Sequence, residues 1–205
     1  MPKVLVLFAH PALEKSRVNR HLVAAIRGLE GITINDLYDC YPEFDVDIRR
    51  EQELLLAHEV VVLQHPFYWY STPALFKQWQ DLVLEHGWAY GSGGTALRGK
   101  IGVSAITTGG SEEAYREGGH NHFTMQQLLA PIQQTANLCG MDFLPPFVVH
   151  GTHSLSSARI TDHANDYRRV VEALRDGSLD YEKARQFPRL NSDLQSLLPQ
   201  SEADA

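Results

Sequence analysis

The sequence predicts an α/β fold in which a five-stranded parallel sheet carries helices on both faces. Short apolar runs alternate with longer amphipathic segments along the chain, as expected of consecutive βαβ units. The first run, residues 3–9, is continuously apolar, which is typical of a strand buried on both faces of a parallel sheet. Five strands alternating with five helices favour the strand order 2-1-3-4-5 over a six-stranded dinucleotide-binding fold.

Each element has its own sequence signals. Ser16 is the expected N-cap of the first helix, and Gly140 the expected stop of the fourth. Pro145 and Pro146 give the last strand an edge position, because proline lacks the N–H that a central strand donates. The expected strands are 3–9, 32–38, 59–64, 100–106 and 143–150, and the expected helices are 17–29, 46–57, 73–86, 123–139 and 156–174. The periodic pattern ends near Asp176, so we expect a domain over 1–176 and a loosely ordered tail over 177–205.

Composition limits the classes of function. The chain has 205 residues, 43% of them hydrophobic and 21% charged, as in a globular domain. Its formal net charge of -7 opposes binding to nucleic acid or to an anionic bilayer. No apolar run approaches the length of a membrane span, so we expect a cytoplasmic protein without direct membrane insertion. The cysteines, Cys40 and Cys139, are expected to be reduced packing residues.

The segment after the first strand combines a turn with a helix start. Ligands of open α/β sheets bind beyond the carboxyl ends of the strands, where this segment must lie. A helix start presents free N–H groups and a partial positive charge, so a phosphate is expected on Ser16 and on the amides of Arg17, Val18 and Asn19. His10 adds a further hydrogen-bonding group. An ordinary N-cap beside a loop histidine is the alternative.

The segments after the third and fourth strands are also distinctive. The third strand leads into four consecutive aromatic side chains, and exposing them is costly unless a flat ligand or a second subunit covers them. Loop anchoring into the core is the alternative. The fourth strand leads into a polar turn that lets backbone amides approach a ligand closely, although similar turns are common. The residues concerned are Phe67, Tyr68, Trp69 and Tyr70 in the first segment and Thr107, Thr108, Gly109 and Gly110 in the second.

Taken together, these segments resemble the NAD(P)H:quinone oxidoreductase family of flavodoxin-like proteins, especially the ancillary proteins of glutathione-regulated potassium-efflux systems. The resemblance runs from Val4 to Val170 and includes 41–48 (YPEFDVDI), 86–97 (HGWAYGSGGTAL), 107–110 (TTGG) and 144–147 (LPPF). It implies that His10 and residues 16–19 hold the phosphate and ribityl chain of a flavin. It also implies that 67–70 and 107–110 hold the isoalloxazine ring. FMN is the flavin of the nearest resemblance, and FAD is an alternative because some members of the family take it.

The same resemblance implies that Tyr115 and His120 line the substrate site. They lie five residues apart here, whereas the larger flavoenzymes of the family place the equivalent pair six apart. Polar residues on a mobile loop are the alternative interpretation.

Other chemistries find less support in the sequence. Residues 94–100 imitate a phosphate-binding P-loop, but Ile101 replaces the required Ser or Thr and the segment precedes a strand. The histidines at 120, 122, 150 and 153 lack a metal-site spacing with cysteine or carboxylate, so no metal is expected. A serine nucleophile in a Gly-x-Ser-x-Gly elbow is absent from the sequence.

Two hypotheses about function follow from the resemblance. The first is an FMN-dependent NAD(P)H dehydrogenase (quinone) in which hydride passes by a ping-pong cycle from NAD(P)H through flavin N5 to a quinone or related electrophile. In that cycle Tyr115 and His120 would donate hydrogen bonds or a proton to the forming hydroquinone. The second is a regulatory subunit of a potassium/proton antiporter, peripheral on the inner face of the membrane, with flavin as structural ligand or redox sensor. A homodimer is implied in either case.

Overall fold

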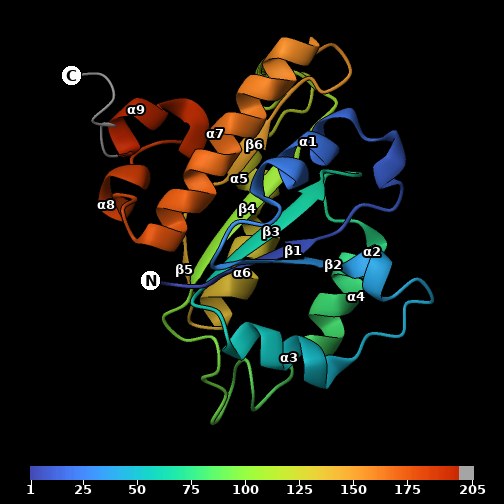
Figure 1. Ribbon diagram of the computed structural model, residues 1–205, viewed down its shortest axis with the longest axis vertical. Helices are drawn as coiled ribbons and strands as arrows, with labels where there is room; N and C mark the ends of the chain where they lie inside the picture. The colour runs from blue at the N-terminus through green and yellow to red at the C-terminus, as the bar shows by residue number, and fades with distance from the viewer. Residues whose placement is uncertain (199–205) are drawn as a thin grey trace.

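The computed structural model describes residues 1–198 and contains a parallel sheet flanked by helices (Figure 1). The order is β2-β1-β3-β4-β5, with β6 paired to β4 beyond this path, and every pairing is parallel. This confirms the predicted fold class and strand order. The strands are β1 Val4–Phe8, β2 Ile32–Asp36, β3 Val60–Pro66, β4 Ile101–Thr107, β5 Asp142–Phe143 and β6 Phe147–Val149.

The predicted fifth strand, 143–150, is two short strands instead of one. β5 pairs with the start of β4 at Ile101, whereas β6 pairs with its end from Ala105 onward. Pro145 and Pro146 lie between them and carry no N–H for a continuous ladder. The expected edge position is correct, and the prolines divide this edge strand into two short strands.

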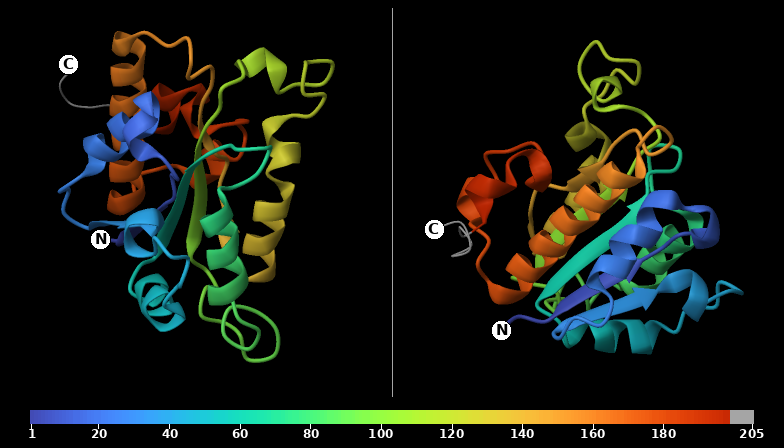
Figure 2. Two further views of the ribbon diagram at one scale, coloured as in Figure 1. Left: turned by 90° about the vertical axis from the view of Figure 1, so that its right-hand side faces the viewer. Right: turned by 45° about the horizontal axis from the view of Figure 1, so that its top comes forward.

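Helices cover both faces of the sheet. The left-hand view of Figure 2 shows the sheet between α1 and α7 on one side and α4 and α6 on the other. The longer helices are α1 Arg17–Ile26, α3 Ile48–Leu56, α4 Ala74–Val83, α6 Ala130–Leu138 and α7 Ser157–Asp176. The short ones are α2 Leu37–Cys40, α5 Met125–Leu128, α8 Tyr181–Ala184 and α9 Leu194–Leu197, with 3-10 turns η1 Leu13–Lys15, η2 Glu112–Ala114 and η3 Leu190–Ser192. None of the helices within residues 1–198 combines the length and apolarity needed to cross a bilayer.

The predicted helix over 123–139 is interrupted. Thr124 caps α5 through a capping box with Gln127, and α6 starts two residues after α5 ends, with a proline in its first turn. Pro131 has no N–H to donate, and its ring clashes with the carbonyl four residues earlier in a continuous helix. The break therefore has a local cause in the sequence.

Strand β1 shows how the core is divided. Val4, Val6 and Phe8 belong to the cluster under α1 and α7, while Leu5 and Leu7 belong to the cluster under α3 and α4. All five side chains are fully buried. Alternate residues of a strand face opposite sides, so this continuous apolar run serves two cores.

A buried carboxylate connects the layers on the α3 side. Glu51 is fully buried, and its carboxylate accepts hydrogen bonds from Tyr41 Oη at 2.6 Å, Asn35 Nδ2 at 2.7 Å and Trp79 Nε1 at 2.8 Å. Arg50 forms an ion pair with it. Burial, followed by the hydrogen bond to Glu51, raises the pKa of Tyr41 to about 12. One side chain thus joins β2, α3, α4 and the segment after α2.

The expectation of a loose tail from residue 177 is wrong for the part that the structure describes. Beyond α7 the chain forms α8, η3 and α9, which lie beside α7 (Figure 1). Their apolar side chains are buried in the core under α7, namely Leu179, Ala184, Leu190, Leu194 and Leu197. The spacing of these residues is irregular, which hid the segment from a search for helical periodicity. Residues 199–205 lie outside the described part, and a separate domain over 1–176 stays a prediction.

Replacing Glu51 tests the contribution of the buried carboxylate. Glu51→Ala leaves the donors of Tyr41, Asn35 and Trp79 unpaired, so we expect a loss of about 3–5 kcal/mol in the free energy of unfolding. Chemical denaturation measures the loss. The control, Glu53→Ala, changes an exposed glutamate of the same helix and is expected to alter stability by less than about 0.5 kcal/mol. Equal effects of the two variants would contradict a special role for Glu51.

Candidate functional site

A cleft lies where β1, β3 and β4 end. Its volume is about 280 Å³, a size suited to a small-molecule ligand. The cleft is at the carboxyl edge of the sheet, where ligands of open α/β folds bind. Its lining is His10, Ala12, Lys15, Ser16, Arg17, Val18, Asn19, Pro66, Phe67, Tyr68, Thr107, Gly109, Thr152 and His153.

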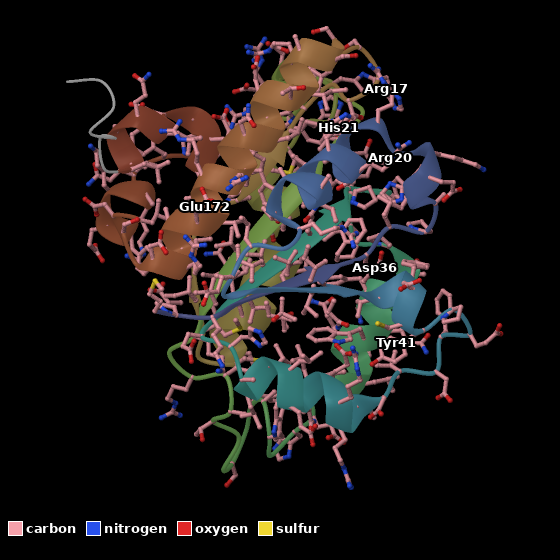
Figure 3. The ribbon with its side chains drawn as sticks, in the orientation of Figure 1. Arg17, Arg20, His21, Asp36, Tyr41 and Glu172 are labelled. Atoms are coloured by element: carbon pink, nitrogen blue, oxygen red, sulfur yellow. The ribbon has the colours of Figure 1, made fainter. Side chains whose placement is uncertain are left out.

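The start of α1 forms one end of the cleft. Ser16 is its N-cap, as predicted, and the Ser16 hydroxyl accepts from the Asn19 amide at 3.1 Å. The amides of Arg17 and Val18 belong to the first turn, where helix geometry offers no acceptor. Arg17 lies at this end of α1 (Figure 3), and its guanidinium donates to the Leu155 carbonyl at 2.9 Å. This end of the cleft therefore suits an anion.

His10 contributes a directed hydrogen-bond donor. Its Nδ1 lies 3.1 Å from the Ala12 amide and accepts from it, so a neutral ring carries its proton on Nε2. Burial lowers the pKa of His10, against the opposing effect of Glu14, and the ring therefore stays neutral at pH 7. His10 packs edge-on against Tyr68, with the ring centroids 6.1 Å apart.

Asn19 has a buried acceptor without a partner. Its Nδ2 donates to Thr107 Oγ1 at 2.9 Å, which joins the start of α1 to the end of β4. Its Oδ1 has no hydrogen-bond partner in the structure, although the residue is only 1% exposed. An unpaired buried acceptor costs free energy unless a ligand supplies a donor. Asn19 thus fits a ligand with a hydroxyl or N–H group at this position.

The turn after β4 is held from both sides. The Phe67 amide donates to the Thr107 carbonyl at 2.8 Å, and the Thr108 amide to the Val149 carbonyl at 2.9 Å. The Thr108 side chain is buried and donates to the Gly110 carbonyl at 2.9 Å. Thr107 and Gly109 line the cleft, whereas Thr108 and Gly110 are not among its lining residues.

The aromatic segment after β3 divides into two pairs. Phe67 and Tyr68 line the cleft. Trp69 and Tyr70 form the centre of a tight turn closed by the Ser71 amide donating to the Tyr68 carbonyl at 3.0 Å. Their φ angles are 51° and 61°, a left-handed conformation that glycine and asparagine adopt far more readily than tryptophan or tyrosine. Trp69 is 93% exposed. Strain and exposure at one place favour an external partner for these rings.

The two predicted substrate residues have different environments, and neither is among the residues that line the cleft. Tyr115 packs against Phe67, with ring centroids 6.3 Å apart, and against His150 at 5.4 Å. A Cβ at Gly110 would lie 3.1 Å from the Tyr115 ring, so glycine permits this approach. Burial raises the pKa of the Tyr115 phenol. His120 lies on the same loop and is exposed.

Sequence reasoning missed several residues of the lining. Lys15, Thr152 and His153 were not predicted, and a Cβ at Gly109 would lie 2.8 Å from His153 Nε2. Thr152 and His153 follow the last strand, whose carboxyl end shares the edge with the others. That placement was available from the predicted topology. In residues 1–198, no group of three or more His, Cys, Asp or Glu side chains is arranged to hold a metal.

A second cavity differs in character. It has a volume of about 40 Å³ and lies between α4 and α6, with Trp79, Ile132 and Met141 among its mostly apolar lining. It holds neither a helix start nor a charged side chain, so the cleft at the strand ends is the better candidate site.

Curated relatives share most of this chain. An uncharacterized NAD(P)H oxidoreductase, YrkL, of Bacillus subtilis is 48% identical over 173 residues, which cover 84% of this chain and 98% of that protein. The glutathione-regulated potassium-efflux system ancillary protein KefG of Yersinia enterocolitica is 44% identical over 84% of this chain and 94% of its own length.

Solved structures agree in fold. General stress protein 14 of Treponema denticola, in complex with FMN, has a TM-score of 0.81 and 37% identity over 84% of this chain and 99% of its own. An NADPH-quinone reductase from P. pentosaceus has a TM-score of 0.75 and 32% identity over 82% of this chain and 96% of its own. The Flavodoxin_2 family, described as having a flavodoxin-like fold, matches residues 2–171. The chain therefore belongs to the Flavodoxin_2 family.

Proposed function

We propose that this protein is an FMN-dependent NAD(P)H:quinone oxidoreductase. The observation that carries the proposal is the cleft at the carboxyl ends of β1, β3 and β4, which offers an anion-binding helix start at one end and aromatic rings beside it. The relative named as an NAD(P)H oxidoreductase and the solved NADPH-quinone reductase support the reaction class. The FMN complex of general stress protein 14 supports the choice of flavin, and FAD is not proposed.

Each part of FMN has candidate partners in the cleft. We assign the phosphate to the Ser16 hydroxyl and to the amides of Arg17, Val18 and Asn19, with His10 donating from Nε2. Asn19 Oδ1 would accept from a ribityl hydroxyl and so gain its missing partner. We assign the ring system to two segments, Phe67, Tyr68, Trp69 and Tyr70 on one side and Thr107, Thr108, Gly109 and Gly110 on the other.

When bound, FMN would supply hydride chemistry, accepting a hydride from NAD(P)H and then transferring it to a quinone in a ping-pong cycle. The chain would hold the reactants in position and supply proton donors. Because burial raises the pKa of Tyr115, its phenol stays protonated at neutral pH and is available to donate to a quinone oxygen. We assign the same role to His120, which lies exposed on the same loop.

A regulatory role in potassium efflux is the second candidate. The KefG relative, identical at 44% of positions, is named as an ancillary protein of such a system. In this role the chain would dock on a potassium/proton antiporter at the inner face of the membrane, with FMN as structural ligand or redox sensor. The two roles are compatible in one protein.

We also propose a homodimer in which the exposed aromatic rings are covered. Trp69 is 93% exposed, Tyr70 49% and Phe123 54%, and Tyr70 Oη bonds Asn121 at 3.2 Å. This hydrogen bond links the two segments that carry the exposed rings. Large exposed aromatic side chains are typical of contact surfaces.

An anaerobic experiment tests the function directly. Purified protein is loaded with FMN, mixed with NADPH or NADH, and then given a benzoquinone. We expect the flavin absorbance near 450 nm to bleach and then recover. Absence of bleaching with either nucleotide would reject the oxidoreductase. Bound FMN without turnover, together with co-purification of a membrane antiporter, would favour the regulatory role.

A pair of buried asparagines tests the flavin site. Asn19→Leu removes the acceptor that FMN would satisfy and also the hydrogen bond to Thr107, so we expect at least about tenfold weaker FMN binding and a stability loss of about 1–2 kcal/mol. Asn35→Leu removes a donor to Glu51 that is not among the residues lining the cleft, and we expect a stability loss of about 2–3 kcal/mol with unchanged FMN affinity. Fluorescence titration and chemical denaturation measure the two effects. Unchanged FMN affinity in Asn19→Leu would refute the assignment.

A substitution in the strained turn is expected to change stability and FMN affinity in opposite directions. Trp69→Asn places a residue that tolerates positive φ at this position, so the flavin-free protein should gain about 1 kcal/mol of stability. FMN affinity should fall about tenfold, because the ring loses an aromatic contact. Leu138→Asn is the control, because it removes an exposed apolar side chain from the end of α6, away from the cleft. An unchanged FMN affinity in Trp69→Asn would separate this ring from the flavin site.

A further inference from the structure

Residues 177–198 lie beyond the part of the chain that the family shares. The family match ends at residue 171, and the YrkL match covers 98% of that protein but only 84% of this chain. The segment is nevertheless folded. It runs beside α7 in the right-hand view of Figure 2 and buries a row of leucines in the core under that helix. We call residues 177–198 the C-terminal segment.

The C-terminal segment is fixed to the edge of the sheet. The Asn191 side chain makes both hydrogen bonds that a neighbouring strand would make to Val148, donating to its carbonyl at 2.8 Å and accepting from its amide at 3.1 Å. The Leu190 amide donates to the Pro146 carbonyl at 2.9 Å. Backbone groups on the outer side of β6 thus have partners, and η3 has one position relative to β6.

Arg189, directly before η3, reaches the loop that carries Tyr115. Its Nη2 lies 2.7 Å from the carboxylate of Glu112, at the start of η2. The Arg189 side chain is only 15% exposed, whereas that of Glu112 is 62% exposed. A guanidinium removed from water depends on its carboxylate partner more than an exposed one does, because loss of that partner leaves its charge uncompensated.

The loop over residues 111–123 has mostly internal backbone contacts. The Tyr115 amide donates to the Glu112 carbonyl, the Asn121 amide to the Ala114 carbonyl, and the His122 amide to the Gly119 carbonyl. Such a loop keeps its shape but needs side chains to fix it on the rest of the protein. Arg189 supplies such a contact from one side, and Tyr70, through Asn121, supplies one from the other.

The effect of Arg189 extends to the residues beneath Tyr115. The Tyr115 ring packs on His150, and His150 Nδ1 lies 3.1 Å from Thr108 Oγ1 in the turn after β4. Burial lowers the pKa of His150 to about 4, and the charge of Arg189 is the next largest cause.

We propose that Arg189 is a positioning residue: the C-terminal segment holds the 111–123 loop through the pair of Arg189 with Glu112, and thereby sets the position of the Tyr115 ring against Phe67 of the cleft. Only the assignment of Tyr115 to the substrate site rests on the proposed function. The attachment of the loop itself does not depend on it.

Hydrogen exchange measures the attachment without any assay of activity. In Arg189→Ala we expect amides of 111–123 to exchange at least about fivefold faster than in the wild-type protein, because the loop opens locally more often. Arg185→Ala is the matched control, because Arg185 belongs to the same segment but pairs with Asp142 of β5. Arg189→Lys keeps the charge and should restore most of the protection.

A charge exchange supplies a stricter test. Arg189→Glu should speed amide hydrogen exchange in the 111–123 loop. Arg189→Glu combined with Glu112→Arg should slow this exchange again, because the pair is restored with its charges reversed. Unchanged exchange in Arg189→Ala, equal loosening in Arg185→Ala, or no restoration in the double variant would each overturn the proposal.

Turnover then tests the consequence for Tyr115. With a benzoquinone as acceptor, Arg189→Ala should raise KM about threefold or more, because the loop that carries Tyr115 is less firmly held. An unchanged KM despite a loosened loop would overturn the effect on Tyr115. A wild-type protein without turnover would reject the proposed function instead, and hydrogen exchange would still decide whether Arg189 holds the loop.

Discussion

Burial of the sheet on both faces is the constraint on which the rest of the structure depends. Strand β1 is wholly apolar and β3 and β4 are largely so, because helices cover them on both faces. The few polar side chains of these strands are buried, and the polar groups that a ligand can reach lie where the strands stop. At that edge Asn19 of α1 bonds Thr107 of β4, so the helix start and the strand end have a fixed relative position. The cleft follows from this arrangement.

Several features of the cleft are costly for the chain alone. Asn19 Oδ1 is buried without a partner, and Trp69 and Tyr70 adopt a left-handed backbone with their rings largely exposed. The Glu51 network, in contrast, pairs each oxygen of its carboxylate. Asn19 and the turn at Trp69 and Tyr70 thus bring an unpaired acceptor and backbone strain to the same edge, a combination typical of sites that a ligand completes.

The C-terminal segment adds a folded layer beyond the region matched to the family. Asn191 replaces a missing neighbour strand at the edge of β6, and Arg189 extends from this fixed point to Glu112. A segment outside the region matched to the family thus contacts the loop that carries Tyr115. Related proteins can share a fold and still differ in the segments that support its loops.

The sequence by itself determined the sheet order, the Ser16 cap and the location of the cleft, because periodicity and capping are local and parallel strands place their ends together. The tertiary structure decided the features that depend on contacts between residues far apart in the sequence. It brought His153 beside Gly109, Arg189 beside Glu112, and the irregularly spaced leucines of 177–198 into the core. Such contacts depend on how separate elements pack, and local spacing does not encode that packing.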